Sequence, residues 1–117
     1  MVPALGIERD VGPIEVMVFN IGANVPSSIL EETARKYFKI WEMACFSGFL
    51  AGREVAKRMV KRGRGTILFT GATASLRGAS HFAAFSGAKH ALRALAQDAA
   101  HVVRLRCAVR RASRGTP

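Results

Sequence analysis

The chain has 117 residues and a mass of 12.6 kDa, so it is one small domain or a part of a larger one. Hydrophobic residues make up 50% of it and charged residues 22%, a balance that excludes a wholly disordered chain. We expect neither a membrane span nor a secretion signal, because no apolar run approaches the roughly 18 residues that cross a bilayer. Cys45 and Cys107 are too few and too far apart for a disulfide framework, which favours a cytoplasmic protein.

The net charge of +10 is concentrated in two segments. Residues 101–117 contain five arginines and no acid, and residues 53–64 contain six basic residues and one glutamate. Such patches attract phosphate backbones, but no nucleic-acid-binding motif accompanies them. We therefore interpret them as a solvated helix end and a basic, irregular tail, and we do not expect nucleic acid as a partner.

The first elements are expected before residue 25. Residues 1–13 show little pattern and indicate a short helix fragment or a loop. The largely apolar, β-branched run 14–19 predicts a strand that is buried on both faces of a parallel sheet. Residues 20–24 are rich in turn formers and follow the carboxyl end of this strand, the edge at which open α/β sheets bind ligands.

Apolar residues recur at helical spacing over residues 33–61 and predict one long helix. The helix begins either in a capping box at Ser28 or at Thr33, which is an equally good cap. Lysines and arginines crowd its last turns, where they complement the helix dipole, and Gly63 and Gly65 end it.

The interior glycines Gly48 and Gly52 either weaken this helix or allow it to approach a neighbouring element closely. A second apolar strand over residues 66–70 leads into a loop of small residues at 71–75. An alanine-rich helix follows from about residue 81 to 100.

Strand, long helix, strand and helix in this order predict an α/β unit with parallel strands and a right-handed crossover. Two strands that are buried on both faces need helices on each face and strands at each edge. This chain supplies only two helices and one further strand in residues 101–109. As a lone monomer the chain would then expose sheet edges and apolar surface. We therefore interpret residues 1–100 as the central part of a larger domain and residues 101–117 as its basic tail.

Several segments occur in the order and at the spacing of a known family. Residues 18–22 (VFNIG) stand where that family has V-N-N-A-G, and residues 70–78 (TGATASLRG) resemble the loop after its next strand. The long helix with residues 41–50 separates them, and residues 85–89 (FSGAK) stand in the place of Y-x-x-x-K. Over about residues 13–100 the chain thus resembles the short-chain dehydrogenase/reductase family. The resemblance implies a fragment of a Rossmann-like, doubly wound parallel sheet.

In that family a tyrosine exchanges a proton, and a lysine lowers the tyrosine pKa and holds the nicotinamide ribose. By resemblance, Lys89 matches the lysine. Phe85 stands at the tyrosine position, where a phenyl ring has no proton to give. Any proton transfer would then come from water, which implies a weakly active or inactive enzyme.

The family's serine, which orients the substrate carbonyl, falls on Ala72, with Thr73 and Ser75 nearby as stand-ins that would polarise the carbonyl. The family's asparagine, which supports a water in the proton relay, falls on Ala44. Of the four catalytic positions, Lys89 alone is therefore filled as the family pattern requires.

The resemblance implies NAD or NADP as the cofactor. Ordinary members cradle the pyrophosphate with a G-x-x-x-G-x-G turn, and this pattern does not occur in the sequence. Asn20 could equally end its strand with side-chain-to-backbone bonds, and Lys89 could be a solvated helix lysine. The residues that match the remaining cofactor-binding positions are Asn20, Gly22, Ala23, Thr70, Gly71 and Lys89.

Family membership implies NAD(P)-dependent hydride transfer at a small carbonyl or alcohol, and a homo-oligomer formed through the two long helices. The family's N-terminal and C-terminal parts have no counterpart here, so we expect a truncated chain with little or no activity. The main alternative is a non-catalytic dimerisation or interaction module. A basic nucleic-acid-binding protein and a chain without a stable fold of its own are further alternatives. The isolated histidines His81, His90 and His101 predict no metal site.

Overall fold

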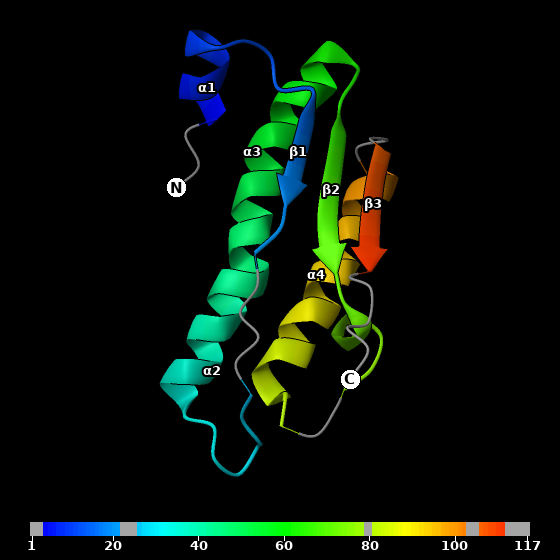
Figure 1. Ribbon diagram of the computed structural model, residues 1–117. Helices are drawn as coiled ribbons and strands as arrows, with labels where there is room; N and C mark the ends of the chain where they lie inside the picture. The colour runs from blue at the N-terminus through cyan, green and yellow to red at the C-terminus, as the bar shows by residue number, and fades with distance from the viewer. Residues whose placement is uncertain (1–3, 22–25, 79–80, 103–105, 112–117) are drawn as a thin grey trace.

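The computed structural model describes residues 4–21, 26–78, 81–102 and 106–111, and its elements follow the predicted order (Figure 1). No helix in these ranges is long and apolar enough to span a membrane. A π-helical segment, η1, joins α2 to α3, and a 3-10 turn, η2, follows β2. The elements are α1 (Ala4–Asp10), β1 (Val16–Phe19), α2 (Ala34–Trp41), η1 (Glu42–Phe46), α3 (Ser47–Arg62), β2 (Thr66–Gly71), η2 (Thr73–Ser75), α4 (Ala83–Val102) and β3 (Arg106–Arg111).

The three strands form one parallel sheet in the order β1-β2-β3. Val16 lies beside Thr66 in the register, and Thr66 lies beside Arg106, so the carboxyl ends of all strands meet at one edge. The predicted α/β unit with parallel strands is confirmed. β3 overlaps the further strand expected in residues 101–109 and lies wholly within residues 101–117, so residues 106–111 are a strand and not part of an irregular tail. Residues 103–105 and 112–117 lie outside the described residues.

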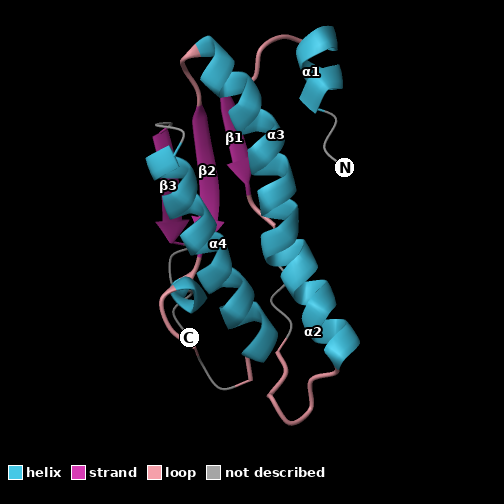
Figure 2. Ribbon diagram, turned by 180° about the vertical axis from the view of Figure 1, so that it is seen from behind, coloured by secondary structure: helices cyan, strands magenta, loops and turns pink. Residues whose placement is uncertain are grey.

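Both long helices cover the same face of the sheet, and Figure 2 shows α3 and α4 in front of the strands. The apolar sides of these helices pack against the inner side chains of the strands and form a core. Removing this apolar surface from water is the main favourable contribution to folding. The core consists of Phe19, Val55, Met59, Ile67, Phe69, Leu92 and Ala96.

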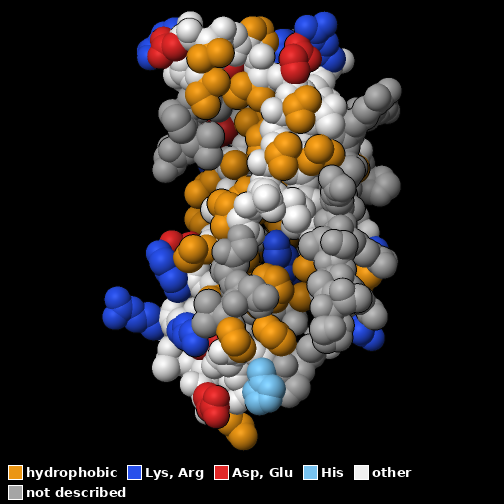
Figure 3. All heavy atoms as spheres, in the orientation of Figure 1, with side chains coloured by type: hydrophobic (Ala, Val, Ile, Leu, Met, Phe, Trp, Pro, Cys, Tyr) orange, Lys and Arg blue, Asp and Glu red, His pale blue; other side chains and the backbone are white. Residues whose placement is uncertain are grey.

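The opposite face of β1 is open, so the prediction that this strand is buried on both faces is wrong. Val16 and Val18 are 56% and 57% exposed, whereas Phe19 is 4% exposed. Side chains alternate along a strand, and Val16 and Val18 point to the face that no described helix covers. Figure 3 shows hydrophobic side chains gathered where β1 crosses this face. The expected exposure of apolar surface by a single chain is therefore observed.

The long helix begins and ends with local signals in the sequence. Thr33 caps it, since its Oγ1 accepts a hydrogen bond from Lys36 N at 3.1 Å. The alternative start at Ser28 is wrong. Glu32 N donates a hydrogen bond to the Ser28 carbonyl at 2.9 Å, but this turn is separate from α2, which begins at Ala34. Gly63 ends α3 in the left-handed conformation, with φ of 72°, as predicted.

A cluster of charged groups holds α1 against the end of α3. Arg62 donates hydrogen bonds to the Glu8 carboxylate at 2.8 Å and to the Ile14 carbonyl at 2.6 Å, and Glu8 accepts from Ile14 N at 3.1 Å. The backbone hydrogen bond from Ile14, followed by the contacts with Arg62, lowers the pKa of Glu8. The N-terminal segment is therefore a docked helix rather than a loop.

The interior glycines of α3 allow the helix to approach the sheet closely. A Cβ atom at Gly48 would lie 2.9 Å from Leu92 Cδ1 and 3.1 Å from the Phe19 ring. A Cβ atom at Gly52 would lie 3.2 Å from the Phe69 ring. Of the two predicted roles, close packing is the one that the structure supports.

We expect Gly48→Ala to lower the free energy of unfolding by about 1 kcal/mol. Overpacking costs about 1–3 kcal/mol, which exceeds the gain of about 1 kcal/mol in helix propensity. Gly87→Ala in α4 is the matched control, because its Cβ would meet only the Tyr37 hydroxyl, at an ordinary 3.5 Å. That variant should gain up to about 1 kcal/mol. Urea unfolding followed by circular dichroism measures both changes, and a stabilised Gly48 variant would contradict the packing argument.

Candidate functional site

Lys89 is the one charged residue among the buried side chains of the described chain, with 4% exposure. Its Nζ lies 3.1 Å from the Thr70 carbonyl oxygen and 3.4 Å from the Ile21 carbonyl oxygen. Thr70 lies near the end of β2 and Ile21 follows β1, so the amine spans the carboxyl ends of two strands. Burial lowers the pKa of Lys89, because desolvation disfavours the charged form. Lys89 is therefore not a solvated helix lysine.

Phe85 lies one helical turn before Lys89 on α4, and it is 9% exposed. The centroid of its ring is 5.8 Å from Lys89 Nζ. The centroids of the Phe82 and Phe85 rings are 6.3 Å apart. A phenyl ring neither donates nor accepts a proton. The pair therefore forms a cation–aromatic contact in the place of an acid–base pair.

The loop after β2 is closed by its own serine. Ser75 Oγ accepts a hydrogen bond from Ala72 N at 3.1 Å, and Ser75 N donates to the Ala72 carbonyl at 2.9 Å. Ser75 is 3% exposed, so its hydroxyl serves the loop itself. Thr73 lies in the same turn, and its side chain is outside the described part. Thr70 and Gly71 end β2 at the predicted edge.

The other predicted positions are less closely grouped. Asn20 follows β1 and is exposed, and Gly22 and Ala23 lie outside the described residues. Ala44, at the asparagine position, is completely buried in η1 and packs in a second core with side chains of α2 and α4. Its methyl group has no polar atom with which to hold a water. The predicted residues that the described structure brings together are thus Thr70 and Lys89.

The backbone groups around this site could not be predicted from the residue types. Besides the two carbonyl partners of Lys89, the segment after β1 is joined to the start of α4 by an isolated parallel bridge between Ser27 and Phe82. Ser27 N donates to the His81 carbonyl at 2.6 Å, and His81 has a φ of 68°, which is uncommon for a residue with a Cβ. Backbone atoms leave no signature in residue types, so only the strand ends pointed to this edge.

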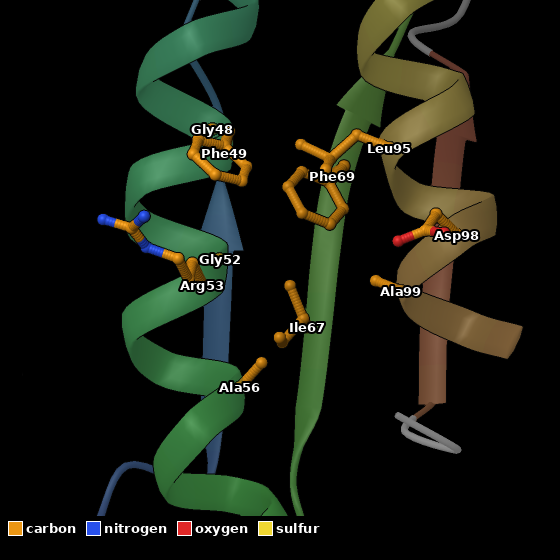
Figure 4. Close-up of a pocket in the computed structure, with 10 residues that line it drawn as sticks. All are labelled: Gly48, Phe49, Gly52, Arg53, Ala56, Ile67, Phe69, Leu95, Asp98 and Ala99. Atoms are coloured by element: carbon orange, nitrogen blue, oxygen red, sulfur yellow. The ribbon is translucent and has the colours of Figure 1, made fainter. Parts of the chain in front are cut away.

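A separate cavity of about 200 Å³ lies between α3 and α4, and none of the predicted site residues lines it. Figure 4 shows Ile67 and Phe69 of β2 between the two helices, with Arg53 on one side and Asp98 on the other. Phe49, Ala56 and Leu95 complete a mainly apolar wall. The cavity thus suits apolar side chains better than a polar substrate.

The basic segment of α3 is partly neutralised. Arg62 and Arg58 lie 2.8 and 3.8 Å from the Glu8 carboxylate, and Arg64 lies 2.6 Å from the Glu15 carboxylate. Arg53 also lies 3.9 Å from the Glu54 carboxylate, so four of the six cations in residues 53–64 have acidic partners, which weakens the patch as a polyanion-binding surface.

The fold and the site together define a Rossmann-like α/β unit with a buried lysine at the carboxyl edge of its sheet. A family model described as short chain dehydrogenase matches residues 4–110. The chain therefore belongs to the short-chain dehydrogenase family.

Solved structures agree with this assignment. A short-chain dehydrogenase from Rhodopseudomonas palustris is 48% identical, with a TM-score of 0.89 over 95% of this chain and 54% of that protein. Sorbitol-6-phosphate 2-dehydrogenase from Erwinia amylovora is 19% identical, with a TM-score of 0.84 over 91% of this chain and 43% of that protein. The second likeness shows the fold alone.

Two curated relatives are sugar-acid dehydrogenases by name. 2-Dehydro-3-deoxy-D-gluconate 5-dehydrogenase from Formosa agariphila is 29% identical over 94 residues, which are 80% of this chain and 36% of that protein. Gluconate 5-dehydrogenase from Gluconobacter oxydans is 32% identical over 62 residues, which are 53% of this chain and 24% of that protein. The chain thus spans about a third or less of the length of these relatives.

We expect Ser75→Ala to lower the free energy of unfolding by about 1–3 kcal/mol, because it leaves the amide of Ala72 without its buried partner. Ser47→Ala is the control, since the Ser47 hydroxyl bonds to a carbonyl of its own helix near the surface, and its loss should change stability by no more than about 0.5 kcal/mol. Thermal and urea unfolding measure both variants. Equal, small effects would show that the Ser75 hydroxyl does not hold the loop.

Proposed function

We propose that this chain carries the substrate-facing part of an NAD(P)-dependent oxidoreductase that transfers a hydride at a small carbonyl or alcohol. The observation that carries the proposal is the buried Lys89 at the sheet edge, one turn after the aromatic position of the family motif. Residues 1–100 are then the central part of the catalytic domain. The names of two relatives make sugar acids the first substrate class to test.

The residues present fit one half of the cofactor. Lys89 has one N–H beyond the two that face the Ile21 and Thr70 carbonyls, and this donor suits the hydroxyls of a nicotinamide ribose. Asn20, Gly22, Ala23 and Gly71 are the other positions proposed along this edge. The sequence has no glycine-rich turn, so the pyrophosphate half finds no cradle in this chain.

In the mechanism proposed for this chain, no side chain at the tyrosine position exchanges a proton with the substrate. A bound nicotinamide would supply or accept the hydride. Lys89 would hold the ribose, and the Thr73 hydroxyl would polarise the substrate carbonyl, a role for which Ser75 is less suited because its hydroxyl closes the loop. Phe85 cannot exchange a proton, so water must do so, and we propose slow turnover for that reason.

We expect Phe85→Tyr to raise turnover at least about a hundredfold, because it restores a general acid one turn from a lysine that lowers its pKa. The initial rate of nucleotide reduction with gluconate, measured with NAD and with NADP, gives the result. Phe82→Tyr is the matched control, since it adds the same hydroxyl to the neighbouring ring and should leave the rate unchanged. No gain in the Phe85 variant would overturn the idea of an otherwise intact pocket.

We also propose that the chain forms a homo-oligomer through its long helices. Phe38, Trp41, Phe46 and Phe49 form a row of rings along α2, η1 and α3, with successive centroids 6.4, 6.0 and 6.1 Å apart. Phe38, Phe46 and Phe49 are 60%, 39% and 37% exposed. This aromatic row adjoins the apolar cavity between α3 and α4, and a second copy of the chain would cover both. The same surface supports the alternative function, a non-catalytic dimerisation module.

We expect Phe46→Glu to weaken self-association at least about tenfold, because it places a charge in the centre of the aromatic row. Ile29→Glu is the matched control, since Ile29 is 85% exposed in the loop before α2 and should not contribute. Size-exclusion chromatography with light scattering over a range of concentrations measures the change. A wild-type chain that is monomeric throughout would refute the oligomer.

A further inference from the structure

In the described part of the chain, β1 has one edge that pairs with no other strand. It lies at one side of the sheet, and its neighbour there is β2 (Figure 1). The Glu15 carbonyl accepts a hydrogen bond from Thr66 N at 2.9 Å and therefore faces β2. Because backbone groups alternate in direction along a strand, the N–H and C=O groups of Val16 and Val18 point to the other, free edge.

The same two residues carry exposed apolar side chains. Val16 and Val18 are more than half exposed on the sheet face that no described helix covers, and Leu68 lies half-buried beside Val18 on that face. An exposed, β-branched edge strand is a template for a further strand. One added strand would satisfy the free backbone groups and cover the valine side chains at the same time.

A mainly apolar groove of about 250 Å³ adjoins this edge at the carboxyl end of β1. Ile21, which follows the strand, lines one side of it, and Met43, Phe46 and Leu50 line the helical side. Ile21, Met43 and Phe46 are each about two-fifths exposed. Since η1 and α3 line the groove, it lies on the helix-covered side of the sheet. A partner that fills both places therefore needs a strand for the edge and a helix for the groove.

The direction of the added strand follows from the candidate site. The Ile21 carbonyl lies 3.4 Å from Lys89 Nζ, so the lysine and the carboxyl end of β1 share one edge of the sheet. A strand parallel to β1 would end at this same edge. In Rossmann-like sheets a glycine-rich turn after such a strand holds a pyrophosphate at the start of the next helix. This turn is the element that the sequence lacks.

The lengths of the relatives leave room for such a unit. The match to the Rhodopseudomonas palustris dehydrogenase uses 95% of this chain but 54% of that protein. The relative from Formosa agariphila is covered over 36% of its length. A strand, a turn and a helix need roughly 30 residues, which the uncovered parts of both relatives exceed. The missing surface is therefore one that these longer proteins can supply from their own chain.

We propose that the free edge of β1 docks a second polypeptide, which adds a parallel strand followed by a glycine-rich turn and an amphipathic helix. The added strand bonds to the backbone of Val16 and Val18, and the helix fills the groove beside Ile21. The assembled sheet then brings together a pyrophosphate cradle from the partner and Lys89 from this chain. The docking stands on the free edge, and only its nucleotide-binding consequence rests on the proposed function.

The test co-expresses the full-length chain with a tagged probe. The probe is the N-terminal part of the Rhodopseudomonas palustris dehydrogenase, ending where that protein begins to match this chain. We expect affinity purification and light scattering to give a one-to-one complex, in which hydrogen exchange at the Val16 and Val18 amides is slower than in the chain alone. Absence of a complex would overturn the proposal. Exchange at these amides that is already slow in the chain alone would do so too, because a second copy would then occupy the edge.

Two variants of Val18 separate the backbone of the edge from its side chain. Val18→Pro removes an N–H that β2 does not use, so circular dichroism should show a retained fold while affinity for the probe falls at least about tenfold. Val18→Thr keeps the N–H and the β-branched shape, and its affinity should stay within about threefold of the wild type. Equal affinities of the two variants would contradict strand addition. Should Val18→Pro not fold, hydrogen exchange in the wild-type complex still decides the question.

Nucleotide binding separates this proposal from the proposed function. Fluorescence titration with NADH and with NADPH measures the affinity of the complex and of each polypeptide alone. We expect the complex to bind a nucleotide more tightly than either polypeptide alone. A complex that forms without gaining nucleotide affinity would count against the proposed oxidoreductase function, whereas the docking at β1 would stand.

Discussion

The close approach of α3 to the sheet is the contact on which the rest of the structure depends. At Gly48 the helix backbone meets the Phe19 ring and Leu92, and at Gly52 it meets Phe69. The Phe19 and Phe69 rings lie 6.1 Å apart beneath it, so β1, β2, α3 and α4 all meet in one small volume. Because protein interiors are densely packed, a shift of α3 would move α4 as well.

The position of α4 in turn determines the chemistry at the sheet edge. Leu92 packs into this core, and Lys89 lies one turn earlier on the same helix, so the core holds the lysine over the strand ends. The site retains this cation while Phe85, Ala72 and Ala44 lack the polar groups that would act with it. What remains is an amine whose environment consists of backbone dipoles and an aromatic ring.

Local physics made much of the fold predictable. The apolar run 14–19 contains β1, and the segment with helical spacing after residue 33 contains α2 and α3. Thr33 and Gly63 are residue types that commonly cap helices, so both helix ends could be predicted. The one-sided burial of β1 was not predictable in this way. An apolar run shows that a strand can be buried, but the side on which each crossover helix passes depends on contacts far along the chain.

The candidate site was predictable to a similar degree. The motif spacing identified Lys89 and Phe85, and the strand ends identified the edge at which they lie. The roles of Ser75 and of the Ile21 carbonyl could not be foreseen, because a hydroxyl that closes a loop and one that faces a substrate have the same sequence signature. The π-helical segment Glu42–Phe46 likewise has no pattern that separates it from the α-helix on either side.

The parallel register has a consequence for how the chain folds. Each paired residue in the sheet is separated from its partner by a whole helix, α2 to α3 between β1 and β2 and α4 between β2 and β3. The entropy of closing these long loops is lost before any strand contact can form, whereas each helix gains its hydrogen bonds locally. The helices therefore form ahead of the sheet, and β1 and β3, which each pair along one side in the described structure, exchange their amide hydrogens sooner than the central strand β2.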